Sequence, residues 1–406
     1  MSAAPGSLVI RNARAVTLSR GPRPRRGREL RDLALLDAAD VLIENGSIVG
    51  VAPAGQRWSA EQEVDAAGRV LMPAFVDCHT HACWAGSRIE EWERKLAGAT
   101  YLELLASGGG IMSTVRAVRA AAQQDLEDGL VGRLAEFLRQ GTTTVEVKSG
   151  YGLTGPDELK MLRATRGAAG RWAGSVVQTA LLGHAIDEQV PGFVEATIRE
   201  TLPAVVREFP GITVDAFCEK SAWSLEDTVA LLDVARQAGC GVRVHADQFN
   251  PLGMLREAVR LGAISVDHLE ASTPEDLKLL AGSATIGVGL PICGLHLDGR
   301  FANLRRLVDE GGAAAIATNC NPGSAPCTSM PLAVAAAVRH CGLTPGEAIA
   351  ACTVNAAAVL GLSDRGTIAP GQRADLILLK HRDERALAYE LGGNPVDMVI
   401  CGGRLV

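Results

Sequence analysis

Residues 70–81 have the sequence VLMPAFVDCHTH, an apolar run that ends in the pair His79 and His81. The run predicts a buried strand over residues 70–77, with the two histidines just beyond its C-terminal end. Strand side chains alternate between faces, so residues two apart point the same way and two imidazoles can share one ion. Neutral imidazole suits zinc or iron(II). The stretch therefore predicts a metal site at the tip of a buried strand.

The region after this stretch alternates short apolar segments with longer amphipathic ones. Apolar residues recur at helical spacing over residues 125–139, 194–209, 225–238 and 252–260. We expect eight strands, at residues 70–77, 143–148, 175–182, 213–217, 241–245, 264–267, 285–290 and 313–318. Eight strand–helix units of this length predict an α/β fold, the (β/α)8 TIM barrel. A doubly wound open sheet is the alternative, but its G-x-G-x-x-G pattern does not follow any expected strand.

The two ends of the chain have a different pattern, with short strands and many turns. Two apolar runs meet at Asn45-Gly46, which is a strong hairpin signal. Neither end has enough apolar material to form a core alone, so we expect both to combine in one small β-sandwich. The expected division is residues 1–68 and 361–406 for the sandwich and residues 69–360 for the barrel.

Composition excludes several classes of partner. The net charge is −6, so a nucleic acid or a membrane is not an expected partner. The ten cysteines are scattered without a C-x-x-C pair, which is typical of free thiols in a reducing compartment. The N-terminus has no apolar leader segment, and no run of residues is long and apolar enough to cross a membrane. We therefore expect a cytoplasmic protein.

Polar residues follow the expected strands at their C-terminal ends, where barrel enzymes place their chemistry. Five of the eight histidines fall at these positions. A single histidine there is more often structural than functional, but five at one face indicate a site. The candidates that follow strands are His79, His81, Lys148, Tyr151, His184, His245, Gln248, His268, Asn319, Asn321, Gly323 and Ser324.

Across residues 70–374 the chain resembles the imidazolonepropionase family of the amidohydrolase superfamily. The resemblance rests on DCHTH at 77–81, AGSR at 85–88, LAGATY at 96–101, GGGI at 108–111, STVR at 113–116, KSGYGL at 148–153, FCEK at 217–220, HAD at 245–247, DHL at 267–269 and NPGS at 321–324. The family fold is a (β/α)8 barrel with a β-sandwich made from both termini, which agrees with the expected layout.

The resemblance implies a reaction and a set of roles. The reaction is hydrolysis of the lactam C–N bond of 4-imidazolone-5-propanoate, a small-molecule substrate of histidine degradation, to N-formimidoyl-L-glutamate. One zinc or iron ion would polarise the carbonyl and acidify water, and the family suggests a homodimer. The implied metal ligands are His79, His81, His245 and the residue at position 319. The implied substrate contacts are Arg88 for the propionate carboxylate, Tyr151, His184 and Gln248 for the ring, and Asn321, Gly323 and Ser324 for the pocket wall, with His268 beside the reacting water.

Two positions depart from the family pattern. Asn319 stands where the family has an aspartate that binds metal and transfers a proton, and Gln248 stands where many members have glutamate. A neutral amide cannot accept a proton and is a weaker ligand than a carboxylate. The catalytic candidates are therefore His268 and His184, with Gln248 as a hydrogen-bonding group and Asp267 as a further possible base.

Three interpretations stay open at this point. The chain hydrolyses the family substrate with another base, or it acts on a modified imidazolone or hydantoin-like ring, with Cys320 as a possible thiolate ligand. Alternatively, it is a catalytically impaired homologue that binds rather than reacts. A two-metal centre with a carboxylated lysine at Lys148 or Lys220 is a less favoured alternative.

Overall fold

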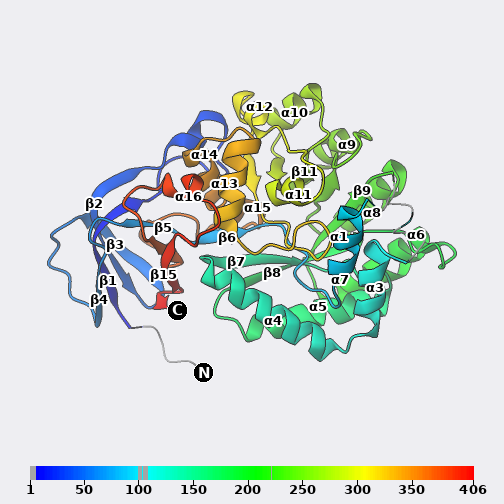
Figure 1. Ribbon diagram of the computed structural model, residues 1–406, viewed down its shortest axis with the longest axis horizontal. Coiled ribbons are helices and arrows are strands. Elements are labelled where there is room, and N and C mark those ends of the chain that lie inside the picture. Colours follow the sequence, from blue (N-terminus) through cyan, green and yellow to red (C-terminus); the bar gives the residue numbers. More distant parts are fainter. Residues whose placement is uncertain (1–5, 99–102, 104–107, 221) are drawn as a thin grey trace.

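The computed structural model describes residues 6–98, 103, 108–220 and 222–406, so residues 99–101 of the LAGATY motif lie outside the described residues. The chain forms two eight-stranded sheets. Figure 1 shows the sheet made from the chain ends on one side and the helix-covered sheet on the other. None of the described helices is long and apolar enough to cross a membrane.

Eight parallel strands form the central sheet in sequence order. Thr80 and Cys320 pair in a parallel bridge just beyond the first and last strands, which closes the sheet into a barrel. This confirms the predicted (β/α)8 TIM barrel over the doubly wound sheet. The strands are β6 (Phe75–Asp77), β7 (Thr142–Lys148), β8 (Ser175–Gly183), β9 (Thr213–Cys218), β10 (Val244–Ala246), β11 (Ser265–His268), β12 (Ile286–Gly289) and β13 (Ala314–Ile316).

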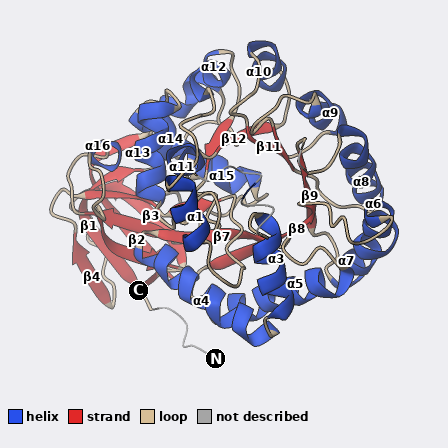
Figure 2. Ribbon diagram, turned by 45° about the vertical axis from the view of Figure 1, so that its right-hand side comes forward, coloured by secondary structure: helices blue, strands red, loops and turns tan. Residues whose placement is uncertain are grey.

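Helices surround the barrel as an outer ring (Figure 2). Several begin at a Ser or Thr whose hydroxyl accepts from the backbone N–H three residues on, as at Thr154, Ser224 and Thr273. The helices are α1 (Ile89–Leu96), α3 (Ile111–Ala120), α4 (Gln123–Arg139), α5 (Gly155–Gly170), α6 (Phe193–Ala196), α7 (Leu202–Glu208), α8 (Leu225–Gln237), α9 (Met254–Leu261), α10 (Pro274–Ala281), α11 (Pro291–His296), α12 (Leu304–Asp309), α13 (Met330–His340), α14 (Pro345–Ala351), α15 (Val354–Val359) and α16 (Ala386–Tyr389).

Two sequence expectations need correction in detail. Residues 70–77 are not one strand, because the chain leaves one sheet at Pro73 and enters the barrel at Phe75. Pro73 has no N–H to donate, which suits the end of a strand. The helix expected at 194–209 is divided into α6, the π-helical turn η2 (Thr197–Thr201) and α7, whose second residue is Pro203.

The second sheet confirms a β-module built from both ends of the chain. Its strands are β1 (Leu8–Val16), β2 (Leu35–Glu44), β3 (Ser47–Pro53), β4 (Gln62–Asp65), β5 (Val70–Pro73), β14 (Leu376–Leu379), β15 (Val396–Cys401) and β16 (Arg404–Leu405). The predicted hairpin joins β2 and β3, and both Asn45 and Gly46 have positive φ as this turn requires. Strand β5 pairs with β1 and β14, which connects the two ends. A 3-10 turn, η1 (Gly27–Arg31), lies between β1 and β2.

Candidate metal centre and active site

Five histidines lie together at the end of the barrel where the strands finish. His79 and His81 follow β6, His184 follows β8, His245 lies in β10 and His268 ends β11. The ring centroids of His79 and His245 are 4.4 Å apart, and those of His81 and His184 are 5.0 Å apart. The structure thus brings together the histidines that the sequence placed after four different strands.

The environment keeps the central imidazoles neutral. Burial lowers the pKa of His79 and His81 well below the usual histidine value. Burial also lowers the pKa of His245, although Asp215 opposes the shift. Neutral imidazole is the form that ligates a metal ion, because its unprotonated nitrogen has a free lone pair.

Two aspartates orient the imidazoles from behind. His79 Nδ1 is 2.6 Å from Asp267 Oδ2, and His245 Nδ1 is 3.1 Å from Asp215 Oδ1. Because a carboxylate only accepts hydrogen bonds, each Nδ1 carries the proton and each Nε2 keeps its lone pair. Such a carboxylate–histidine contact is typical of histidines that hold a metal ion.

A buried ion network in turn holds these two aspartates. Lys148 Nζ lies 2.7 Å from both Glu146 and Asp215. Arg243 donates to Glu146 over 2.7 Å and to Asp267 over 2.6 Å. Lys148 is therefore occupied as an ammonium group between two carboxylates, and Lys220 is exposed, so the structure does not support the carboxylated-lysine alternative.

Several polar atoms at the centre have no hydrogen-bond partner among the described residues. They include His79 Nε2, His81 Nδ1 and Asn319 Oδ1, all of them buried. His81 Nε2 and His245 Nε2 approach to 3.2 Å, and ligand atoms of His79, His245 and His268 lie within 4.8 Å of one another. Converging nitrogens together with an orphaned buried oxygen fit a divalent cation. His268 thus lies closer to this cluster than the sequence implied.

Asn319 lies in the loop after β13, in a left-handed conformation with φ 57°. Its backbone N–H donates to the His79 carbonyl over 3.1 Å. The Asn321 side chain fastens the loop, because its Nδ2 donates to the Asn319 carbonyl and its Oδ1 accepts from the N–H groups of Gly323 and Ser324. Asn321 therefore shapes this wall of the site as well as lining it.

A cavity of about 390 Å³ opens above the histidines. His79 lies beneath this cavity rather than in its lining. The neighbouring thiol of Cys320 is also outside the lining, and it belongs to neither of the groups that could hold a metal among the residues the structure describes. The lining combines the other predicted site residues, except Lys148 and Asp267, with residues that were not predicted: His81, Arg88, Lys95, Ile111, Tyr151, His184, Phe217, His245, Gln248, Phe249, His268, Leu297, Asp298, Asn319, Asn321, Gly323 and Ser324.

Arg88 presents its guanidinium to this cavity from the start of α1. Its Nε donates to Glu91 Oε2 over 2.7 Å, and Nη2 donates to Glu91 Oε1. Its Nη1 faces Thr114 and the backbone of Gly323. Glu91 also accepts from the Gly110 N–H, which connects α1 to the start of α3. One edge of the guanidinium is thus held by protein, and the other faces the cavity wall.

The remaining predicted residues are uncharged polar groups. His184 Nδ1 donates to the Gly150 carbonyl over 2.9 Å, and burial lowers the pKa of His184 to about 3. Gln248 Nε2 donates to Cys293 Sγ over 3.4 Å. Burial raises the pKa of Tyr151, so it stays a phenol. All three can donate or accept hydrogen bonds at neutral pH without carrying charge.

The sequence did not single out the residues that support the centre. Glu146 in β7 and Asp215 in β9 are buried, and so is Arg243 directly before β10. The sequence does contain a pattern that indicates them, because polar residues there recur at a spacing of two. The pairs are Glu146 and Lys148, Arg243 and His245, and Ser265 and Asp267. A period of two places these polar side chains on one face of each strand, here the barrel interior.

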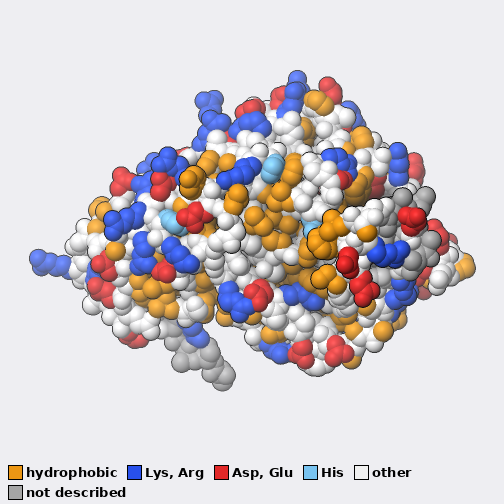
Figure 3. Space-filling view, viewed as in Figure 1, with side chains coloured by type: hydrophobic (Ala, Val, Ile, Leu, Met, Phe, Trp, Pro, Cys, Tyr) orange, Lys and Arg blue, Asp and Glu red, His pale blue; other side chains and the backbone are white. Residues whose placement is uncertain are grey.

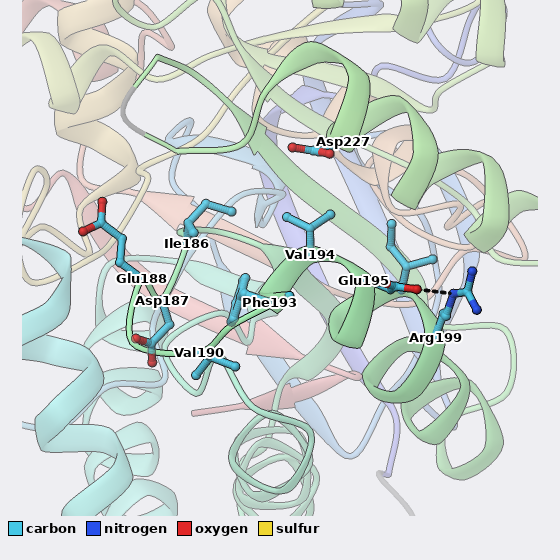
Figure 4. A pocket seen from close by; sticks show the side chains of 11 residues that line it. Ile186, Asp187, Glu188, Val190, Phe193, Val194, Glu195, Arg199 and Asp227 are labelled. Carbon is cyan, nitrogen blue, oxygen red and sulfur yellow. Dashed lines mark ion pairs between the residues drawn. The ribbon is translucent and has the colours of Figure 1, made fainter.

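A larger pocket, of about 640 Å³, lies outside the barrel mouth next to α6. Figure 4 shows its apolar side chains, among them Ile186 and Phe193, together with the ion pair of Glu195 and Arg199 at 3.1 Å. It is lined by no histidine or cysteine, so it lacks the chemistry of the first cavity.

Comparisons with known proteins identify the family of the chain. The model of the amidohydrolase family matches residues 70–406. An imidazolonepropionase from Herpetosiphon aurantiacus is 43% identical, covering 98% of this chain and 96% of that protein. An imidazolonepropionase from Deinococcus radiodurans is 46% identical, covering 94% of this chain and 95% of that protein.

Solved structures show the same fold at low identity. A triazine hydrolase variant superposes with a TM-score of 0.77 at 18% identity, covering 98% of this chain and 94% of the other. An adenosine deaminase from Xanthomonas campestris with bound zinc has a TM-score of 0.70 at 20% identity, covering 98% and 92%. With this fold and with relatives that match nearly its whole length, the chain belongs to the amidohydrolase family and, within it, to the imidazolonepropionases.

Proposed function

We propose that this chain hydrolyses the lactam C–N bond of 4-imidazolone-5-propanoate to give N-formimidoyl-L-glutamate, with one divalent ion in the histidine centre. The curated relatives at 43% and 46% identity carry the name of that activity. The observation that supports the proposal most is the set of buried, unpartnered ligand atoms at His79 and Asn319. Such atoms cost free energy unless a ligand satisfies them.

His79, His81, His245 and Asn319 would hold the ion, which we propose to be zinc or iron. When bound, the ion polarises the lactam carbonyl and lowers the pKa of water. Neutral imidazoles with carboxylate partners suit both metals. The zinc-bound adenosine deaminase of the same fold supports zinc.

His268 is the residue best placed to take a proton. Its Nδ1 lies 3.1 Å from Glu270 Oε1, which leaves Nε2 with a lone pair. His184 is a weak base, since its pKa is lowered to about 3 by burial. Asp267 already accepts from His79, Arg243 and Ser265. Proton transfer therefore falls to the His268–Glu270 pair rather than to the position occupied by Asn319.

Arg88 would bind the propionate carboxylate, because its forked donors match a carboxylate. Tyr151, His184 and Gln248 would hydrogen-bond the ring as uncharged groups. Asn321, Gly323 and Ser324 would form the remaining wall around the substrate. These positions line one continuous cavity, which supports a single substrate site.

One observation favours a second candidate, hydrolysis of a modified imidazolone or hydantoin-like ring. Asn319 and Gln248 both place neutral amides in the cavity lining. A ring with a different donor and acceptor pattern would suit these amides better than the family substrate does. Among the residues that the structure describes, no feature favours the third interpretation, a protein that binds without reacting.

Metal analysis combined with a turnover assay tests the proposal. We expect one zinc or iron per chain and saturable turnover of 4-imidazolone-5-propanoate. The His79→Ala variant should lose both, whereas His381→Ala, outside the barrel mouth, should lose neither. A metal-containing protein that turns over only a modified ring would establish the second candidate. A metal-free protein without turnover would contradict the proposal and support binding alone.

A further inference from the structure

A second group of metal-binding side chains lies beside the histidine centre. It consists of His268 at the end of β11, Glu270 two residues later and Cys293 in α11, and we call it the thiol cluster. The ligand atoms of the three residues lie within 4.8 Å of one another. His268 belongs to both groups, so the thiol cluster touches the proposed site without using His79, His81 or His245.

The thiol cluster is enclosed. The side chain of Glu270 is 4% exposed, and Cys293 is 2% exposed. His268 Nδ1 lies 3.1 Å and 3.2 Å from the two Glu270 oxygens. Within the described part of the chain, Glu270 forms no ion pair with a lysine or arginine. Arg300 acts on Glu270 only by attraction at longer range, so a bound cation would further offset the cost of burying this carboxylate.

The donor set selects the kind of cation. A thiolate, an imidazole and a carboxylate are the three ligand types of protein zinc sites. The thiolate favours a soft or borderline ion over magnesium or calcium, which prefer oxygen. Burial and the neighbouring Glu270 raise the pKa of the Cys293 thiol, so a bound cation would have to displace its proton. Gln248 Nε2 already donates to Cys293 Sγ over 3.4 Å, which would help to stabilise the metal-bound sulfur.

We propose that His268, Glu270 and Cys293 form a second, inhibitory site for one thiophilic divalent cation such as zinc, cobalt or cadmium. The cation would form bonds to Cys293 Sγ, His268 Nδ1 and a Glu270 oxygen. The thiol proton leaves to solvent, and the imidazole proton transfers from Nδ1 to Nε2. With its Nε2 protonated, His268 can no longer accept a proton from the reacting water. The inhibition, though not the binding, rests on the proposed function.

Titration of the holoenzyme with cobalt(II) tests the site. Protein that already carries one zinc ion receives further cobalt(II), and near-ultraviolet absorption reports the thiolate-to-cobalt charge-transfer band. We expect a band that saturates at one cobalt per chain and is lost in Cys293→Ser. The band should persist in Cys320→Ser, a matched control because Cys320 is also buried near the centre.

A second variant covers the case in which Cys293→Ser fails to fold. Glu270→Gln should weaken cobalt binding by about tenfold or more, because it removes a charged ligand. An absent band in the wild type, a band that persists in Cys293→Ser, or unchanged affinity in Glu270→Gln would each overturn the second site.

Turnover measured along the same titration tests the inhibition. Activity should fall as the band rises in the wild type, and Cys293→Ser should resist added cobalt. A full band with undiminished turnover would overturn the inhibitory role. Absence of turnover in the one-zinc protein would instead contradict the proposed function, and the charge-transfer band keeps the two failures distinguishable.

Discussion

Asn319 makes the proposed metal centre more positive than a carboxylate would. Its Oδ1 is an uncharged ligand atom that is buried and has no hydrogen-bond partner in the described part of the structure. Behind His79 and His245, the carboxylates of Asp267 and Asp215 bring negative charge to the centre through the imidazoles. An ion in such a site keeps more of its charge, which favours an anionic substrate and acidifies water more strongly. Compared with a carboxylate, the amide of Asn319 cannot act as a base, but it leaves more positive charge on the bound ion.

Removing His268 should affect proton transfer and leave the metal in place. In His268→Ala we expect kcat to fall about 10²–10⁴-fold, the usual contribution of a general base. His184→Ala should reduce kcat less, because a pKa of about 3 makes His184 a weak base at neutral pH. Steady-state kinetics with metal analysis of each variant provides the measurement. A His268→Ala enzyme with full kcat would contradict the assignment.

At the scale of elements, the barrel strands carry the support for the site. Strands β7, β9 and β11 point Glu146, Lys148, Asp215 and Asp267 into the interior, where they form one ion network with Arg243, which directly precedes β10. Each member has at least one bonded partner of opposite charge, so the network resists rearrangement. The rigidity of these strands is thereby transmitted to His79 and His245.

The Asp215→Asn substitution tests this support. An amide cannot hold the His245 Nδ1 proton as a carboxylate does, so we expect metal affinity to fall about 10–100-fold. Asp40→Asn is a matched control, because Asp40 is equally buried but lies in the sheet of the chain ends. Competition with a metal chelator measures both variants. Equal affinity in Asp215→Asn and the wild type would show that the strand network does not set the ligand geometry.

Helix α1 carries a different function, the orientation of Arg88. Its apolar side chains Ile89, Trp92 and Leu96 are exposed, and Figure 3 shows hydrophobic side chains gathered over this helix. Packing of these apolar side chains against the barrel therefore does not hold the helix in place. Its attachment comes from Glu91, which bonds Arg88 within the helix start and Gly110 across to α3.

Replacing Glu91 should weaken substrate binding without changing the chemical step. In Glu91→Gln we expect KM to rise about tenfold with kcat unchanged, because a charged hydrogen bond to Arg88 is lost. The effect should vanish for an imidazolone that lacks the propionate group. Glu90→Gln, on the same helix and exposed, serves as the control. An unchanged KM, or an equal effect on the truncated substrate, would exclude this positioning role.

At the scale of the whole molecule, one buried carboxylate joins the barrel to the chain between β1 and β2. Glu347 in α14 accepts from Arg31 at the end of η1 and from Arg305 in α12, each over 2.8 Å. Burial alone would raise the pKa of Glu347, but bonds from Arg305, Thr344 and Arg31 hold it below its usual value. The contact therefore stabilises the fold only while Glu347 is ionised.

The Glu347→Gln variant should be less stable at neutral pH, with a free energy of unfolding lower by about 1–3 kcal/mol. A folded pKa below the unfolded value means that the stabilisation is present above the unfolded pKa of about 4.3 and is lost as pH falls through the folded value. The difference from wild type should therefore shrink in acid. Urea denaturation at neutral and acidic pH measures it. A difference that grows in acid would contradict this sign.

The sequence predicted the barrel well because strand and helix periodicities are local signals. It also placed the five histidines at one barrel end, since that inference needs only the strand order. It missed the break at Pro73, because the choice between two sheets depends on partners distant in sequence. It likewise missed Glu270 and Cys293 as neighbours, since β11 and α11 meet only in three dimensions. Long-range packing, and not local pattern, sets those details.

Hydrolysis at this site requires that catalysis proceeds with Asn319 among the metal ligands. Comparing kcat/KM for 4-imidazolone-5-propanoate in the wild type and in Asn319→Asp, at one bound metal ion per chain, tests it most directly. We expect substantial turnover by the wild type and a change of less than about tenfold in the variant, which is a barrier difference under about 1.4 kcal/mol. An inactive wild type with a variant that gains orders of magnitude would contradict it.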